Sequence, residues 1–464
     1  MKETDNMELN AGGVSNAPEK RVLIYATTAY MIDQFNMMNI RMLQEMGYTV
    51  DAACNFESGN PVSEERLKSF RQELDEMGVR QYQLPLTRNI FDLVHNGKAL
   101  TRSVRIMKER GYDFVHCHTP VGSVIARLAC RITHTKVIYT AHGFHFFDGA
   151  PWLNWAVYYP VEKLFSYITD VLITINREDY ERARRKFHMK RLEYLPGIGV
   201  DTDRYRPAVC RATNAAVPGR ESSDGSISNE NDDNRSLNDI RSLNDIRSLR
   251  SESGADDSTM LLLSVGELSR RKNHMAVLRA LRQIIRDTSD IHGSITENAA
   301  EDNDDSEHDK GADHHNIPQF RYIIAGTGVL KDELQKYIDE NELSGRVSLL
   351  GYRTDVDRLY RAADAFVFPS LQEGLPAALM QAMASGLPAA VSRIRGNADL
   401  IDEKGGFLFD VSDPSSVENS IRALLEAPGE TRHEMGMYNR AVIQEGFSLE
   451  AVTRKTFEIY TELA

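Results

Sequence analysis

Short runs of apolar and β-branched residues alternate along the chain with longer stretches in which apolar residues have helical spacing. In the first half, the helical stretches include FNMMNIRMLQEMG and LVHNGKALTRSVRIMKERG. The runs that predict strands are RVLIYAT from Arg21, TVDAACN from Thr49, YDFVHCH from Tyr112, KVIYTAH from Lys136 and DVLITIN from Asp170. Strands that alternate with helices predict a parallel sheet covered on both faces.

The second half repeats this scheme. Its predicted strands are MLLLSVG from Met260, FRYIIAG from Phe320, RVSLLG from Arg346, AFVFPS from Ala365 and PAAVS from Pro388. Helical spacing is found at 272–286, 329–342, 375–385 and 414–426, and again in the final segment 448–464. The two series meet near 195–207, so the sequence predicts an α/β protein with two doubly wound domains, 20–207 and 208–447. Ligands of such sheets bind beyond the carboxyl ends of the strands.

The negative charge of the chain is local. The net charge is −13, yet residues 209–258 and 287–316 together hold 20 acidic and seven basic side chains. Both stretches lack aromatic residues, and the first contains a hexapeptide, RSLNDI, repeated from Arg235. Such compositions predict disordered surface insertions, or alternatively a docking segment for a partner. Residues 1–19 are expected to form a disordered tail, and acidic loops argue against nucleic-acid binding.

Composition narrows the functional classes further. The four cysteines lie far apart, which fits a reducing cytosol and excludes a disulfide scaffold. No run is apolar for the roughly 18 residues of a membrane span, and the polar N-terminus is unlike a signal peptide. A cytoplasmic protein is therefore expected. Motifs of kinases, simple dehydrogenases and zinc proteases are absent.

Candidate binding residues follow the predicted strands. Glu373 and Gly374 come after AFVFPS, and Gln381 follows about two helical turns later. Arg270, Arg271 and Lys272 come after MLLLSVG, where Lys272 is expected to begin a helix whose N-terminus, with these charges, suits a diphosphate. For each group, a solvated surface residue is the plainer interpretation on these grounds alone.

Histidines follow two strands of the first half. His142 and His145 come after KVIYTAH, and His118 ends YDFVHCH. His142 and His145 could donate hydrogen bonds to a ligand in the cleft, whereas a metal site would need a third convergent ligand, so no metal is predicted. Asp33 lies in the loop after the first strand, and the GTG sequence that begins at Gly326 follows a strand in the second half.

The string SLQEGLPAALMQAMASGLPAA from Ser370 resembles the signature of glycosyltransferase family 4, whose members have the GT-B fold of two Rossmann-like domains separated by a cleft. The resemblance implies that 448–464 packs back on the first domain. It also implies that Glu373 and His142 act at the donor sugar, while Gly374 and Leu375 belong to the donor-binding motif. In the family a second Glu holds the nucleotide ribose; here Gln381 occupies that position, which predicts weaker nucleotide affinity.

Other positions carry over less completely. Lys272 matches a family Lys, whereas Glu267 occupies a position that is commonly Arg, so Arg270 or Arg271 is expected to supply the charge. The loop MIDQFN, which contains Asp33, resembles the form found in capsular and exopolysaccharide enzymes and is expected to form a cleft wall. Arg353 resembles a position that stacks on the nucleotide base. His118, His145 and Gly326 are expected to line the cleft.

The resemblance therefore implies a retaining glycosyltransferase that needs no cofactor beyond its nucleotide-sugar substrate, expected to be UDP-linked. The implied acceptor is a glycan or a polyprenyl-diphosphate-linked sugar in capsular, exopolysaccharide or related synthesis. Alternatives are a nucleotide-sugar epimerase of the same fold and a non-catalytic nucleotide-sugar-binding protein. Residues 20–207 hold 26 basic and 21 acidic side chains, so peripheral contact with the inner face of the cytoplasmic membrane is a further expectation.

Overall fold

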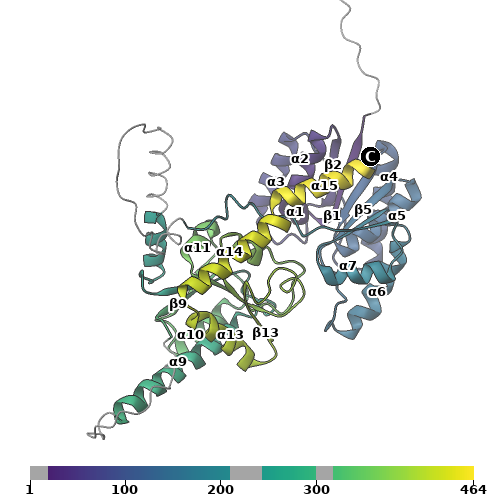
Figure 1. Ribbon diagram of the computed structural model, residues 1–464. Helices are drawn as coiled ribbons and strands as arrows, with labels where there is room; N and C mark the ends of the chain where they lie inside the picture. Colours follow the sequence, from purple (N-terminus) through teal and green to yellow (C-terminus); the bar gives the residue numbers. More distant parts are fainter. Residues whose placement is uncertain (1–18, 209–242, 299–316, 464) are drawn as a thin grey trace, which may run out of the picture.

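The computed structural model describes residues 19–208, 243–298 and 317–463, and its main feature is a pair of parallel sheets in two lobes (Figure 1). The first sheet has the order β3-β2-β1-β4-β5-β6-β7. Its strands are β1 (Arg21–Thr28), β2 (Thr49–Asn55), β3 (Arg80–Gln83), β4 (Phe114–His118), β5 (Lys136–Ala141), β6 (Val171–Thr174) and β7 (Arg191–Tyr194).

Helices cover both faces of this sheet. One face is packed by residues of α1 (Ala29–Phe35), α2 (Met37–Glu45) and α3 (Glu64–Glu76). The other is packed by residues of α4 (Leu93–Arg110), α5 (Pro120–Thr133), α6 (Trp152–Ser166) and α7 (Arg177–Lys186). The central strands are rich in apolar residues and almost wholly buried, because helices cover both of their faces.

The second sheet has the order β10-β9-β8-β11-β12-β13. Its strands are β8 (Met260–Val265), β9 (Phe320–Ala325), β10 (Val347–Gly351), β11 (Ala365–Phe368), β12 (Ala389–Ser392) and β13 (Gly406–Phe409). Its helices are α9 (His274–Asn298), α10 (Lys331–Glu340), α11 (Val356–Ala362), α12 (Ala377–Ala384), α13 (Pro414–Glu426) and α14 (Gly429–Gly446). The strand order reverses between β8 and β11, as it does between β1 and β4, which makes these two places the expected ligand sites.

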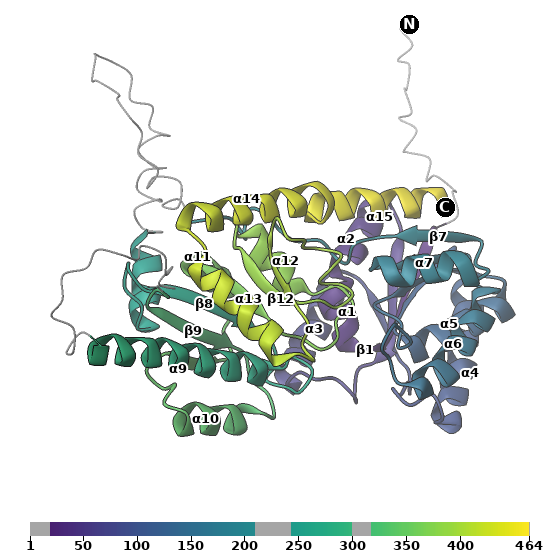
Figure 2. The ribbon, with the colours of Figure 1, turned by 60° about the horizontal axis from the view of Figure 1, so that its bottom comes forward.

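The last helix, α15 (Leu449–Leu463), belongs to the first domain by its contacts. Its residues Val452, Ile459 and Tyr460 are buried in the same cluster as β1 and β4. Figure 2 shows α14 beside the second sheet and α15 continuing along the first. No helix within the described ranges is long and apolar enough to cross a membrane.

Part of the predicted insertion 209–258 is folded, which corrects the expectation of disorder there. Residues 243–252 form a helix, and Leu249 is 2% exposed in the core of the second domain. Arg250 on this helix donates to Asp364 at 2.8 Å. The repeat explains the result: it places Leu and Ile three residues apart, on one face of a helix, so a low-complexity sequence still buries an apolar stripe.

The second predicted insertion, 287–316, also begins as regular structure. Helix α9 continues to Asn298, beyond the predicted end of its helical pattern at 286. The rest of the two insertions, 209–242 and 299–316, and most of the predicted tail, 1–18, lie outside the described residues.

Candidate active site

Two loops of the second domain meet where its strand order reverses. Strands β8 and β11 are neighbours, so the turn 266–273 after β8 lies beside the loop 369–376 after β11. The backbone N–H of Leu371 donates to the carbonyl of Arg271 at 2.8 Å, which holds the two loops together. This contact brings together two groups of residues that lie about one hundred positions apart in the sequence.

Glu373 is the centre of a small ionic cluster. Its Oε1 accepts from Nζ of Lys272 at 2.7 Å and from Nη1 of Arg271 at 2.8 Å. The side chains of Glu373 and Lys272 are only 10% and 11% exposed, whereas Arg271 is 45% exposed. Lys272 also lies 4.7 Å from the centre of the Phe368 ring. Two cations share one carboxylate, so the cluster keeps a net positive charge.

Lys272 does not begin a helix, contrary to the sequence-based expectation. Helix α9 starts at His274, and Lys272 lies in the preceding turn, where its N–H donates to the carbonyl of Ser269 at 3.1 Å. Asn273 has φ = 53°, a left-handed conformation that interrupts the helical path. Burial lowers the pKa of Lys272, although the adjacent Glu373 favours its charged form.

The cluster opens into a pocket of about 330 Å³ between the two domains. The pocket is lined by residues of both: Met31, Phe35, His142, Gly143, Ile175, Arg271, Gln372, Glu373, Gly374, Leu375 and Arg395. Gly374 makes this close approach possible, because a Cβ there would lie 2.5 Å from the carbonyl oxygen of His142. The domains therefore touch, backbone against backbone, at the pocket.

His142 contributes the first domain's polar group to this pocket. Its Nε2 lies 3.1 Å from Nδ1 of His118, and its ring centroid is 5.3 Å from that of Phe35. Burial lowers the pKa of His142 to about 4, so the ring is neutral at pH 7 and acts as a hydrogen-bonding group, not as a cation. His118 is buried behind His142 and does not line this pocket.

A third histidine, His116, links this pair to the C-terminal helix α15. The His116 ring lies against that of His118, with centroids 4.2 Å apart and the ring planes tilted by 39°. Its Nδ1 is 2.7 Å from the Tyr460 hydroxyl and its Nε2 is 2.8 Å from Oγ1 of Thr140. Burial lowers the pKa of His116 to about 3. A chain of neutral, buried groups thus leads from α15 to the pocket.

Arg395 is a pocket residue that the sequence reasoning missed. Its Nη1 donates to Asp179 at 2.8 Å, and its Nη2 donates to the carbonyl of Phe144 at 2.7 Å, both across the domain boundary. Burial raises the pKa of Asp179 to about 6, and Arg395 opposes that rise. Arg395 follows β12 at a strand's carboxyl end, which is the signal that could have identified it.

Two predicted cleft residues of the first domain point elsewhere. Asp33 is 4% exposed and paired with Arg66, so its neighbours Met31 and Phe35 line the pocket instead. His145 is exposed, and its ring stacks on Tyr158 with centroids 4.6 Å apart. The MIDQFN loop therefore forms a wall of the pocket, but through apolar side chains.

The remaining predicted residues of the second domain do not line this pocket. Gln381 lies on α12, where its Oε1 accepts from the Tyr360 hydroxyl at 3.3 Å. Arg353 makes two 2.7 Å hydrogen bonds to Asp355, and Arg270 is exposed. Gly326 does not line the pocket; a Cβ there would overlap the carbonyl of Gly266, so it serves close packing of adjacent loops.

Comparison with known proteins gives matches in both domains. The family model "Glycosyltransferase Family 4" matches residues 38–204, and "Glycosyl transferases group 1" matches residues 245–442. The chain is 29% identical over 447 residues to the putative glycosyltransferase EpsD of Bacillus subtilis, covering 95% of this chain and 96% of EpsD. It is 26% identical over 392 residues to an Escherichia coli UDP-Gal:alpha-D-GlcNAc-diphosphoundecaprenol alpha-1,3-galactosyltransferase, covering 83% and 84%.

Solved structures show the same architecture. Anabaena Alr3699/HepE in complex with UDP and glucose aligns with a TM-score of 0.65 at 15% identity, over 96% of this chain and 100% of that one. WaaG, a glycosyltransferase involved in lipopolysaccharide biosynthesis, aligns with a TM-score of 0.57 at 14% identity, over 95% and 99%. At such identities the likeness shows the fold, and it confirms the predicted two-domain α/β class.

Proposed function

Because the chain belongs to glycosyltransferase family 4, we propose that it transfers a sugar from a UDP-linked donor to a lipid-linked glycan in exopolysaccharide synthesis, with retention of anomeric configuration. Its relatives support the UDP-linked donor and the lipid-linked acceptor. The Escherichia coli relative uses UDP-Gal and an acceptor on diphosphoundecaprenol, and HepE was solved with UDP and glucose. No feature of the described residues favours an epimerase or a non-catalytic binding protein.

The observation that carries this proposal is the ionic cluster at Glu373. When the bond between a sugar and a nucleoside diphosphate breaks, negative charge grows on the departing phosphate oxygens. Cations already held in place stabilise such charge without reorganisation. Lys272 is fixed by burial and by Glu373, whereas Arg271 is held by the same carboxylate but is 45% exposed, so part of its side chain remains accessible to a ligand.

We assign two roles to Glu373. Its carboxylate positions Lys272 and Arg271, and its remaining acceptor capacity can bind sugar hydroxyls. Gln381 on the following helix is assigned to the nucleotide ribose. An amide makes weaker hydrogen bonds than a carboxylate, so we expect nucleotide affinity below that of relatives with Glu at this position.

His142 and the domain contact complete the proposed site. A neutral His142 can exchange hydrogen bonds with the donor sugar from the first domain. The contact between Gly374 and His142 closes the pocket on one side, which helps to keep water away from the reacting carbon. Transfer to an acceptor hydroxyl is then favoured over hydrolysis.

A two-stage assay tests the proposal. Nucleotide sugars are first screened for thermal stabilisation, and those that bind are then tested for turnover with sugars linked to polyprenyl diphosphate. We expect UDP and a UDP-sugar to raise the melting temperature, and radiolabelled sugar to appear in the lipid fraction only when the acceptor is present. Conversion of the donor to an isomer without acceptor would instead identify an epimerase, and binding with no turnover would identify a binding protein.

We also propose that the first domain contacts the membrane that would hold such an acceptor. Phe91, Leu93 and Val94, at the start of α4, are 72%, 78% and 65% exposed, and the same helix carries several exposed basic residues. Basic side chains near an anionic surface gain about 1 kcal/mol each. We expect salt-sensitive co-sedimentation with phosphatidylglycerol vesicles; no binding at low salt would refute this contact.

A further inference from the structure

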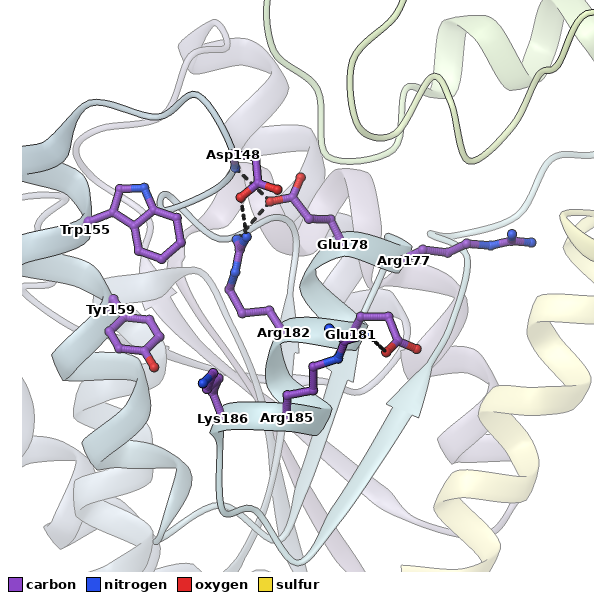
Figure 3. Close-up of a pocket in the computed structure, with 9 residues that line it drawn as sticks. All are labelled: Asp148, Trp155, Tyr159, Arg177, Glu178, Glu181, Arg182, Arg185 and Lys186. Carbon is purple, nitrogen blue, oxygen red and sulfur yellow. Dashed lines mark hydrogen bonds and ion pairs between the residues drawn. The ribbon is translucent and has the colours of Figure 1, made fainter.

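A second pocket, of about 560 Å³, lies in the first domain between α6 and α7 (Figure 3). Its walls differ in chemistry. Helix α6 supplies the rings of Trp155 and Tyr159, whereas α7 supplies the basic side chains of Arg182, Arg185 and Lys186. Asp148, Glu178 and Glu181 also line it, so the pocket sets an aromatic surface opposite a charged wall in which four cations face three carboxylates.

The cations of this pocket are not equally available. Arg182 is 14% exposed and fully engaged, since it donates to Asp148 at 2.7 Å and to Glu178 at 2.8 Å and lies 4.7 Å from the centre of the Trp155 ring. Arg185 is 69% exposed, and its ion pair with Glu181 is long, at 3.6 Å. Lys186 has no ion pair within the part of the chain that the structure describes. Lys186 and Arg185 are thus the charges that can receive an anion.

Charge alone would not identify a site here, because the C-terminal end of any helix favours cations. The aromatic surface is the second observation. Trp152, Trp155 and Tyr159 occupy positions i, i+3 and i+7 of α6 and form one stripe along the helix. Trp152 is 78% exposed, so this stripe runs beyond the pocket as an uncovered apolar surface. A ligand that suits both walls has an apolar chain and an anionic head.

The pocket also adjoins the catalytic one. The loop after β5 connects them, since Gly143 lines the pocket at Glu373 and Asp148 lines the pocket between α6 and α7. Arg395, which lines the catalytic pocket, lies 4.3 Å from the centre of the Phe147 ring in the same loop. A ligand held by Lys186 could therefore extend along this loop toward the site of transfer.

We propose that the pocket between α6 and α7 binds the isoprenoid diphosphate portion of the lipid-linked acceptor. Lys186 and Arg185 bind the diphosphate, the stripe of Trp152, Trp155 and Tyr159 receives the first isoprene units, and the glycan end points to Glu373. The identity of the acceptor rests on the proposed function. The existence of the site does not, because it can be measured by binding alone.

The chain contains two tryptophans, and both lie on this stripe, so intrinsic fluorescence reports on the pocket directly. Titration of the full-length protein with farnesyl diphosphate should change the emission saturably. Farnesol and inorganic diphosphate should each bind at least about tenfold more weakly, because each lacks one half of the ligand. Lys186→Gln should raise the Kd for farnesyl diphosphate about tenfold.

Arg184→Gln is the matched control, since Arg184 is an exposed cation of the same helix that does not line the pocket. It should change the Kd less than twofold. Equal effects of the two substitutions, or no saturable change of emission, would overturn the proposal. So would phosphatidylglycerol vesicles that reproduce the response with the same dependence on Lys186, because the surface would then recognise membrane phospholipid in general.

Turnover separates this inference from the proposed function. Lys186→Gln should raise the KM for a sugar on polyprenyl diphosphate while leaving UDP affinity unchanged. Transfer to the lipid acceptor without farnesyl diphosphate binding would refute only the proposal that this pocket binds the isoprenoid diphosphate. Farnesyl diphosphate binding without any transfer would refute only the proposed function.

Discussion

Arg395→Met should weaken the contact between the two domains. Arg395 is 8% exposed and Asp179 is fully buried, and the two come from different domains. The substitution removes one hydrogen bond to a carboxylate and one to the Phe144 carbonyl, and it leaves Asp179 buried without its cation. A charged hydrogen bond contributes about 1.5–3 kcal/mol, and breaking a buried ion pair costs about 3–5 kcal/mol. We therefore expect the unfolding free energy to fall by about 3–5 kcal/mol at pH 8.

The pKa of Asp179 determines how the loss of stability in Arg395→Met varies with pH. The pKa of Asp179 is raised to about 6 in the folded protein, above the ordinary value of an aspartate, so the fold favours the protonated acid. That contribution to stability is complete below about pH 4 and is lost as the pH rises through 6. Arg395 opposes this rise in pKa, so its removal should raise the pKa further. The penalty of Arg395→Met should then be largest at pH 8 and shrink toward pH 5, where Asp179 is protonated in both proteins.

Chemical denaturation at pH 5 and pH 8 measures both quantities. Arg393→Met is the control, because Arg393 is 57% exposed and lies 3.7 Å from an exposed Glu403, so its loss should change stability by less than about 1 kcal/mol. Adding Asp179→Asn to Arg395→Met should restore part of the stability, since the uncompensated charge is removed. A penalty that does not depend on pH, or strictly additive effects of the two substitutions, would refute the reasoning.

Three further predictions concern the ionic cluster at Glu373 and the corrected insertion. Glu373→Gln should lower kcat by about 10²–10³, because it weakens the hold on Lys272 and on the sugar hydroxyls. It should also lower the melting temperature, since Lys272, only 11% exposed, loses its carboxylate partner. Activity per folded molecule near wild type would show that Glu373 is not a catalytic residue. Lys272→Met should weaken UDP binding by about 1.5–3 kcal/mol in calorimetry, and the same loss in the exposed control Lys336→Met would point to a general charge effect. Leu249→Ala should lower the unfolding free energy by about 2–5 kcal/mol. Arg247→Ala on the same helix should change the unfolding free energy little, because Arg247 is exposed. An unchanged stability of Leu249→Ala would mean that residues 243–252 are dispensable for folding.

The sequence predicted the central strands well because they are buried on both faces and form continuous apolar runs. It missed β3, β7 and β13, which are all edge strands. Their sequences RQYQ, RLEY and GFLF are four residues long, and the first two carry polar residues, so neither length nor pattern distinguishes them from loops. The helix at 243–252 was missed for a different reason. The polar, repetitive composition of 209–258 predicts disorder, although the apolar residues within it have helical spacing.

The candidate site shows a similar division. Glu373, Gly374, Lys272 and His142 were predicted because each follows a strand and belongs to a recognisable motif, and the structure places all four at one pocket or its ionic cluster. Arg395 was missed because its partner Asp179 lies 216 positions away, on another domain, and no local pattern marks such a pair. The side-chain directions of Asp33 and His145 could not be predicted from the sequence either, because they depend on tertiary contacts with Arg66 and Tyr158.

The position of α15 has a consequence for how the protein is made. The first domain ends its own sheet at Tyr194, yet its core includes Val452, Ile459 and Tyr460. At about 5–20 residues per second, a ribosome needs roughly 13–50 s to travel from the end of β7 to α15. During that interval the groove that receives α15 is open, and His116 lacks the Tyr460 hydroxyl. The domain that is synthesised first is therefore completed only after the second domain, up to the end of α14, has been synthesised.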